Sequence, residues 1–201
     1  MSERDGPEIG ATAPGHYGAA ATGVTLAETT FAHAWNVQGD AELFIFAETA
    51  RQVFGFALPT TPNTVSRTDA LTALWLGPTS WLLVAAEAPA LTDFAAKRTR
   101  LNGARGALFD ITATCLAWTI AGPRATTVLA KGCPLDFHPR AFAEGACAQS
   151  VFGHVNTLFY RRDTSTFTLI VGRSYAKSIW RTLCVSAAQY GYDVLPTVPF
   201  R

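Results

Sequence analysis

Apolar and polar positions along the chain predict two series of elements that follow the same order. The first series begins with a strand over residues 31–37. Asp40 can cap a following helix, and Gly55 can end it. The apolar positions of this helix recur with helical spacing and are expected to face a core. They are Leu43, Phe44, Ala47, Ala50 and Phe54.

A β-hairpin and a second helix complete the first series. Residues 71–76 and 81–86 flank Gly77-Pro78-Thr79-Ser80, which is a turn sequence. A helix is expected to begin near Pro89 and to end at Gly103. The apolar side of this helix consists of Leu91, Phe94, Ala95 and Leu101.

The second series repeats this order. Strand material over 107–121 precedes a helix over 123–132, which a proline begins and a glycine ends. A hairpin follows, with strands over 155–161 and 166–172. The last helix runs from Ser174, as its cap, to Gly191. Its apolar face consists of Ile179, Trp180, Leu183, Cys184, Ala187 and Tyr190.

The spacing between the two series indicates an internal duplication. The strand around Trp35 is echoed around Trp118, 83 positions later, and the strand at 80–84 is echoed at 167–171, 87 positions later. We therefore predict an α+β fold with two duplicated β-α-β-β-α halves, at about 31–104 and 107–191, whose helices pack on antiparallel-rich sheets.

The sequences at the two ends of the chain predict no part of this domain. Residues 1–25 are rich in Gly, Ala, Thr and Pro without periodicity, which predicts a flexible N-terminal arm. The duplicated domain is expected to span 26–192. Residues 193–201 contain two prolines and predict an extended tail. No secretory leader is visible at the start of the sequence.

The composition favours a protein that is partly covered by other chains. The net charge of +1 gives no electrostatic case for a nucleic-acid partner. Only 15% of the residues are charged, against about 25% in ordinary soluble domains. No apolar run reaches the roughly 20 residues that a membrane-spanning helix needs. The excess of apolar residues therefore indicates burial against partner subunits.

Four cysteines and four histidines are the first candidates for chemistry. Cys115, Cys133, Cys147 and Cys184 lack metal-type spacing and predict buried reduced thiols of a cytoplasmic protein. Cys133 and His138 form the best local thiol–imidazole pair, against the simpler interpretation of a structural loop. With Cys147 and His154 they could supply four zinc ligands, but the gaps of five, nine and seven are unlike those of structural zinc sites.

Anion and ligand sites have weaker candidates. Gly122-Pro123 could place the start of a helix against a phosphate group. The chain has no dinucleotide-binding or P-loop fingerprint, however, and the beginning of an ordinary helix explains this dipeptide. Five arginines could bind an anion or an acidic partner, or could form a solvated sheet edge. They are Arg124, Arg140, Arg161, Arg162 and Arg173. The 5 Trp and 13 Phe favour core and interface positions over a ligand cage.

Several motifs resemble the gamma subunit of heterotetrameric sarcosine oxidase. The likeness covers roughly residues 25–192 and is densest in the second half. It rests on the runs Ile120–Arg124, Val128–Phe142, Gly145–Gln149, Gly153-His154 and Gly172–Tyr175, and on Leu74–Pro78 with Trp81–Leu83 in the first half.

This resemblance implies a non-catalytic structural subunit that has no catalytic, cofactor-binding or metal-binding residue of its own. The complex would demethylate sarcosine oxidatively to glycine, with oxygen and tetrahydrofolate. Its alpha, beta and delta subunits would hold FAD, FMN, NAD, tetrahydrofolate and zinc, and this chain would pack mainly against alpha. The resemblance also implies the folate-binding aminomethyltransferase type of fold.

Two other interpretations remain open at this point. The chain could serve a related complex, such as an N-methyl amino acid dehydrogenase. It could also bind folate itself in a cleft between its halves, where Asp110 and Asp136 are the only mid-chain carboxylates placed near strand or loop ends. A stand-alone enzyme that uses Cys133 is the least supported reading.

Overall fold

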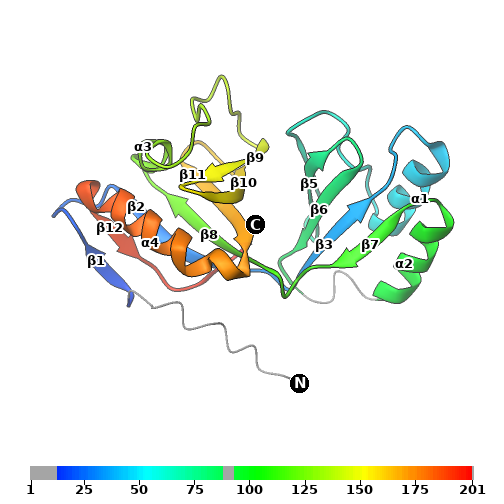
Figure 1. Ribbon diagram of the computed structural model, residues 1–201, viewed down its shortest axis with the longest axis horizontal. Helices are drawn as coiled ribbons and strands as arrows, with labels where there is room; N and C mark the ends of the chain where they lie inside the picture. The colour runs from blue at the N-terminus through cyan, green and yellow to red at the C-terminus, as the bar shows by residue number, and fades with distance from the viewer. Residues whose placement is uncertain (1–12, 88–92, 201) are drawn as a thin grey trace.

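Two β-sheets lie face to face, and each carries two helices on its outer side (Figure 1). The computed structural model describes residues 13–87 and 93–200. In the view of Figure 1 the sheet from the first half lies on the right and the sheet from the second half lies on the left. The layers therefore run helix, sheet, sheet, helix.

The larger sheet has eight strands in the order β1-β12-β2-β8-β11-β10-β9, and β13 pairs with β2 outside this path. Its strands are antiparallel except where β12 and β13 run parallel to β2. The strands are β1 (Gly15–Tyr17), β2 (Val24–Thr30), β8 (Cys115–Ala121), β9 (Cys147–Phe152), β10 (Val155–Arg161), β11 (Thr166–Gly172), β12 (Tyr192–Val194) and β13 (Val198–Pro199).

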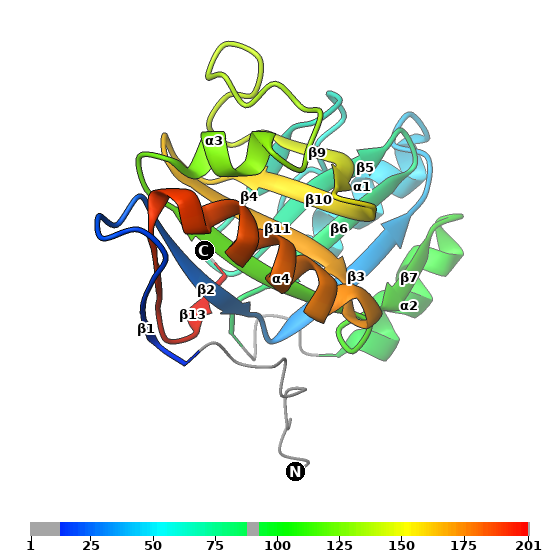
Figure 2. The ribbon, with the colours of Figure 1, turned by 60° about the vertical axis from the view of Figure 1, so that its left-hand side comes forward.

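The smaller sheet has five strands, all antiparallel, in the order β4-β5-β6-β3-β7. They are β3 (His33–Gln38), β4 (Val65–Arg67), β5 (Thr72–Gly77), β6 (Ser80–Ala85) and β7 (Ala107–Asp110). Helices α1 (Phe44–Phe54) and α2 (Phe94–Gly103) cover this sheet. Helices α3 (Ala125–Ala130) and α4 (Ala176–Ala187) cover the larger sheet, and Figure 2 shows α4 crossing its face.

Three apolar clusters hold these layers together. One lies between the larger sheet and its helices, one between the smaller sheet and its helices, and one between the two sheets. Strand β6 contributes side chains to two of these clusters. Trp81 and Leu83 face the helices, whereas Leu82 and Val84 face the other sheet. Because both faces are buried, such strands read as continuous apolar runs.

The predicted α+β class and both predicted hairpins are confirmed, but one spacing is wrong. Trp35 pairs with Leu83, and Trp118 pairs with Leu169. The hairpin offset is therefore 86 positions, from Leu83 to Leu169, and not 87. The 87-residue alignment would match residues on opposite faces, because side chains alternate with period two along a strand.

Strands β2 and β7 each pair in the sheet opposite to that of the strand that follows them in the chain. Strand β2 precedes β3 in the chain but pairs with β8, and β7 precedes β8 but pairs with β3. Only Phe31 and Ala32 separate β2 from β3. The strand material predicted over 107–121 is therefore two strands in two sheets, which no local pattern distinguishes.

The buried face of α1 differs from the prediction. Phe46, Ala50, Val53 and Phe54 are buried, whereas Phe44 is 81% exposed. The helix begins one turn later than Asp40 predicts, with Leu43 as its N-cap. Asp40 instead accepts a hydrogen bond from the Glu42 backbone in the preceding turn.

The predicted ends of the helices agree with the structure only in part. Gly55 ends α1 in the left-handed conformation, as predicted. Tyr175 caps α4 in place of Ser174, after a 3₁₀ turn over Arg173–Tyr175. A second 3₁₀ turn, Ala188–Tyr190, leads to Gly191. Of the predicted apolar side of α2, only Leu101 is buried; Pro89 and Leu91 lie outside the described residues.

The N-terminal stretch is more ordered than the expected arm over 1–25. Strand β1 pairs with β12, and β2 begins at Val24. His16 Nδ1 lies 2.6 Å from Asp193 Oδ1, so β1 is also joined to β12 by an exposed ion pair. Residues 1–12 lie outside the described part of the chain. Within the expected tail, strand β13 runs beside β2.

Candidate functional site

The structure separates the thiol and the imidazole that were the best catalytic pair. Cys133 is buried in the cluster between the larger sheet and its helices. His138 is exposed, and its Nδ1 accepts a hydrogen bond from the Arg140 backbone at 3.2 Å. No hydrogen bond joins Cys133 to His138 in the described part of the chain. The segment has the geometry of a structural loop.

The four candidate zinc ligands are also dispersed. Cys133 lies in the outer cluster of the larger sheet, whereas Cys147 lies in the cluster between the sheets. His154 is exposed in the turn between β9 and β10. Within residues 13–87 and 93–200, no three Cys, His, Asp or Glu side chains gather in a way that could hold a metal ion.

None of the four cysteines forms a disulfide bond, in agreement with the predicted reduced thiols. Cys115, Cys133 and Cys147 are buried, and Cys184 is half-buried. Burial raises the pKa of the Cys115 thiol to about 11, and burial does the same for Cys147. The Cys147 thiol also donates to the backbone oxygens of Thr64 and Trp75, at 3.4 and 3.5 Å. These are packing groups and not activated nucleophiles.

The Gly122-Pro123 turn serves a close approach of two chain segments. A side chain at Gly122 would lie 2.8 Å from the Gly23 oxygen, and Gly122 has a φ of +124°. The Arg124 backbone N–H donates to the same Gly23 oxygen at 3.1 Å. The helix that follows has only six residues, so this turn is explained by packing and does not form a phosphate site.

Arg161 contradicts the prediction of an exposed anion-binding edge, because only 1% of its surface is exposed. Its guanidinium donates to four backbone carbonyls, those of Phe137 at 3.1 Å, Phe142 at 2.7 Å, Asp163 at 3.1 Å and Thr164 at 2.7 Å. Arg161 therefore fastens the loop after α3 to the β10–β11 hairpin. A sequence pattern does not reveal this, because the acceptors are backbone groups.

The other candidate arginines do not converge on one place. Arg124 is exposed beside the ring of Tyr190, and Arg140 is exposed in the loop after α3. Arg173 donates from Nε to the Ala113 oxygen at 2.7 Å, next to the β7–β8 connection. They do not form a shared anion site.

Both aspartates considered for folate organise turns. Asp110 Oδ1 accepts from the Thr112 backbone at 2.9 Å and from the Thr112 hydroxyl at 2.5 Å. Asp136 Oδ1 accepts from the His138 backbone at 2.8 Å. Neither residue lines either of the two cavities described next.

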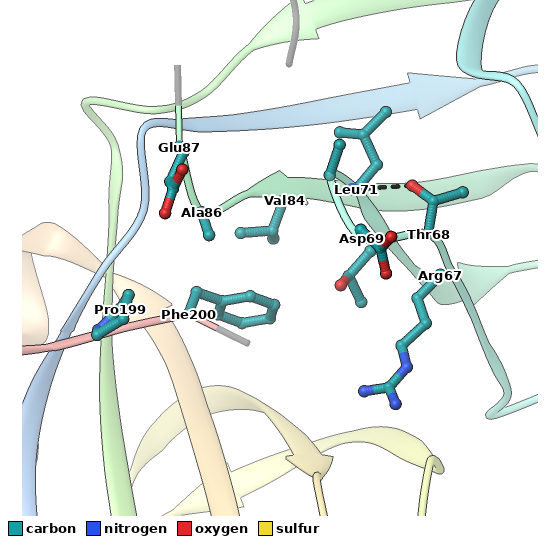
Figure 3. A pocket seen from close by; sticks show the side chains of 11 residues that line it. Arg67, Thr68, Asp69, Leu71, Val84, Ala86, Glu87, Pro199 and Phe200 are labelled. Atoms are coloured by element: carbon teal, nitrogen blue, oxygen red, sulfur yellow. Dashed lines mark hydrogen bonds between the residues drawn. The ribbon is translucent and has the colours of Figure 1, made fainter. Parts of the chain in front are cut away.

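Two cavities border the cluster between the sheets. The larger, of about 740 Å³, lies between the β4–β5 connection, the end of β6 and the C-terminal tail (Figure 3). Leu71, Val84 and Phe200 form its apolar wall, and Arg67 and Glu87 stand at its rim. The smaller, of about 570 Å³, is lined by strands of both sheets without any acidic or basic side chain.

Aromatic side chains serve mostly as core, as predicted. Trp35, Trp81 and Trp118 are each at most 1% exposed. The sequence did not indicate which large apolar side chains would face solvent. These are Phe44, Ile45, Phe109, Tyr175, Val185 and Leu195. They lie on both helical layers as well as on β7 and the tail, and none gathers with catalytic groups.

Among the described residues, no helix is both long and apolar enough to cross a membrane.

Comparison with known proteins identifies the family. The family model described as "Sarcosine oxidase, gamma subunit family" matches residues 38–189. Sarcosine oxidase subunit gamma of Corynebacterium sp. strain U-96 is 32% identical over 124 residues, which are 61% of this chain and 60% of that protein. The subunit gamma of Corynebacterium sp. strain P-1 is 30% identical over 161 residues, 80% of this chain and 78% of that protein.

Solved structures agree with the sequence matches. A chain of heterotetrameric sarcosine oxidase from Corynebacterium sp. U-96, in complex with pyrrole 2-carboxylate, superposes with a TM-score of 0.75 at 26% identity. The match covers 87% of this chain and 88% of that chain. The aminomethyltransferase T of Bartonella henselae has a TM-score of 0.59 at 16% identity, over 89% of this chain and 48% of that chain, and shares the fold. The chain belongs to the sarcosine oxidase gamma subunit family.

Proposed function

We propose that this chain is a non-catalytic structural subunit of a heterotetrameric sarcosine oxidase complex. The complex would convert sarcosine to glycine with oxygen and tetrahydrofolate. The observation that carries the proposal is the superposition of nearly the whole chain on one chain of a heterotetrameric sarcosine oxidase. A match over 87% of the chain supports a place for it in the same kind of assembly.

The arrangement of reactive side chains supports a structural role. The candidate nucleophiles are buried thiols, and the candidate bases and acids organise turns. Nucleophilic catalysis needs a nucleophile, a base and an orienting group within hydrogen-bond reach of one another. We therefore assign the chemistry, with FAD, FMN, NAD, tetrahydrofolate and zinc, to the alpha, beta and delta subunits, and the main contact of this chain to alpha.

The same proposal includes an internal duplication and a cytoplasmic location. The single domain would span 26–192, with halves near 31–104 and 107–191. The exchange of β2 and β7 between the two sheets supports equivalent halves, because β2 precedes β3 but pairs with β8, just as β7 precedes β8 but pairs with β3. The four free cysteines suit a reducing compartment.

Co-expression tests this function. A tagged copy of the chain, expressed with the alpha, beta and delta subunits of the complex, is expected to purify with all three. The purified complex is expected to contain flavin and to oxidise sarcosine. The chain alone is expected to contain no flavin and not to oxidise sarcosine. Sarcosine oxidation by the chain alone would contradict the proposal. Activity on another N-methyl amino acid, with sarcosine inert, would favour the related dehydrogenase complex.

Folate binding by the chain itself is a separate alternative that one titration decides. The aminomethyltransferase likeness concerns the fold alone. Isothermal titration of the full-length chain with tetrahydrofolate is expected to give no heat of binding. Heat that disappears in the variant Arg67→Ala, at the rim of the larger cavity, would instead assign a folate site to this chain.

A further inference from the structure

We propose that the solvent face of α2 is a docking surface for an acidic surface of another subunit. The inference rests on the proposed function, since it requires that the chain be part of an assembly. It goes further by naming the surface and the chemistry of what covers it. Four observations on α2 lead to it.

The first observation is that α2 is packed less fully than α4. Leu101 is the one buried residue of α2, and the half-buried Phe94 contacts the Trp35 ring with 5.1 Å between centroids. Helix α4 follows β11 just as α2 follows β6, but it buries six side chains against its sheet: Ala176, Ile179, Trp180, Leu183, Ser186 and Ala187. A helix that is polar on nearly all sides is typical of a segment that bridges to another body. The comparison with α4 shows that this position in the fold can be packed much more fully.

The second observation is an uncompensated positive charge. Arg98, Arg100 and Arg105 are exposed, and within the described residues no carboxylate lies within 4.0 Å of their guanidinium groups. Arg100 donates to the neutral amide oxygen of Gln52 on α1, at 3.0 Å. The Asp93 carboxylate caps the Ala96 N–H, and the Glu48 carboxylate on α1 is already bound by Arg51 and Gln52. Arginine is also the cation that protein interfaces favour.

The third observation concerns the surface between these arginines. With 100° per residue, Arg98 and Arg100 project on opposite flanks of the helix. Ala95, Ala96 and Thr99 lie between them on the solvent side, and all three are exposed. Short side chains allow another chain to come near the helix, where both arginine flanks can reach its carboxylates.

The fourth observation is the backbone at the two ends of α2. Asp93 has a φ of +63° and Arg105 a φ of +62°, and only one other described residue that is not glycine, Asn63, has a positive φ. A helix end of this kind usually carries glycine. Arg105 therefore has a left-handed backbone conformation that is unfavourable for a residue with a long side chain, and it lies beside the exposed end of the helix. Such positions concentrate at functional sites.

An acidic protein surface fits this face better than a nucleic acid. The chain has a net charge of only +1, and the cations are two arginines of one short helix and Arg105 just after its end. Nucleic-acid binding usually needs a larger basic field. Carboxylates on a protein partner match the charge and the fork geometry of these side chains.

Charge reversal with a matched control tests the docking surface. The variant Arg98→Glu/Arg105→Glu changes one exposed cation on α2 and one just after its C-terminal end. The control Lys177→Glu/Arg181→Glu makes the same change in net charge on α4, where both residues are exposed. Affinity for the purified alpha-beta-delta subcomplex is measured by interferometry at about 50 mM and about 300 mM NaCl. A second variant, Arg98→Ala/Arg105→Ala, removes the charges without reversing them, and circular dichroism checks that every variant is folded.

The α2 reversal is expected to raise Kd about tenfold or more and to reduce its dependence on salt, while the α4 control stays near wild type. Wild-type affinity in both α2 variants, or equal losses in α2 and α4 variants, would overturn the docking surface but leave the proposed function intact. A wild-type chain that binds no subcomplex would overturn both. A DNA duplex that binds the wild type and not the α2 variants, with assembly unchanged, would overturn the protein partner in favour of nucleic acid.

Discussion

The guanidinium of Arg161 lies over the ring of Phe167, with 5.2 Å between Cζ and the ring centroid. Both residues are buried, and no carboxylate among the described residues lies within 4.0 Å of this cation. Four backbone carbonyls and one aromatic face therefore take the place of a counter-ion. This arrangement holds the second half together, because the carbonyls come from two separate loops.

Replacing Arg161 is expected to destabilise the chain strongly. Arg161→Leu leaves the buried carbonyls of Phe137 and Phe142 without a donor, which we expect to cost about 3 kcal/mol in free energy of unfolding. Arg161→Lys keeps the charge but not the planar fork, so we expect a smaller loss. Urea denaturation of the full-length chain measures both. Arg140→Leu, on the exposed loop, is the control, and an equal loss there would contradict the role of Arg161.

Two neighbouring phenylalanines of α1 are expected to behave in opposite ways. Phe46 is fully buried, stacks on Trp81 with 5.9 Å between ring centroids, and fills the space beside Gly39 and Gly106. Phe46→Ala should cost about 3–5 kcal/mol of stability because it leaves a cavity. Phe44→Ala should change the stability of the isolated chain by less than about 0.5 kcal/mol. Chemical denaturation compares the two, and a similar loss for both would mean that Phe44 is buried.

Gly191 is expected to resist substitution. Its φ is +69°, and a side chain there would collide with the backbone oxygens of Ala21 and Ala19. Gly145 has a φ of +76° but faces open space. Gly191→Ala should therefore lower the midpoint of thermal unfolding more than Gly145→Ala, since only the first adds a clash to the strain of positive φ. Equal midpoints would show that backbone strain alone matters at both positions.

Stability is expected to fall in alkaline solution. Burial raises the pKa of the Cys115 and Cys147 thiols from 9.0 to about 11. The folded state therefore keeps protons that the unfolded state releases, so the stabilisation is complete below pH 9.0 and is lost as the pH rises towards about 11. Burial also raises the pKa of Tyr192, to about 12, which extends the loss to higher pH.

Denaturation curves at several alkaline pH values check this prediction. The slope of unfolding free energy against pH is expected to become shallower in Cys115→Ala/Cys147→Ala. A slope that the double substitution leaves unchanged would assign the alkaline effect to other groups.

The elements that the sequence predicted well depend on contacts close along the chain. Both hairpins formed where a short turn separates two apolar runs, and Gly55 ended α1 as its position indicates. The burial of tryptophan followed from the size of its apolar surface. The resemblance on residues 120–154 and 172–175 led to the family that the comparisons identify.

The sequence by itself determined the class of fold, its two hairpins and its family, because local turn chemistry, strand and helix periods and family motifs are all written along the chain. Only the tertiary structure decided that β2 and β7 exchange sheets, that Phe46 and not Phe44 enters the core, and that Arg161 is buried. These features depend on backbone groups and surfaces far apart in the chain. Their energies arise only when two sheets and their helices pack against one another, so no local pattern can contain them.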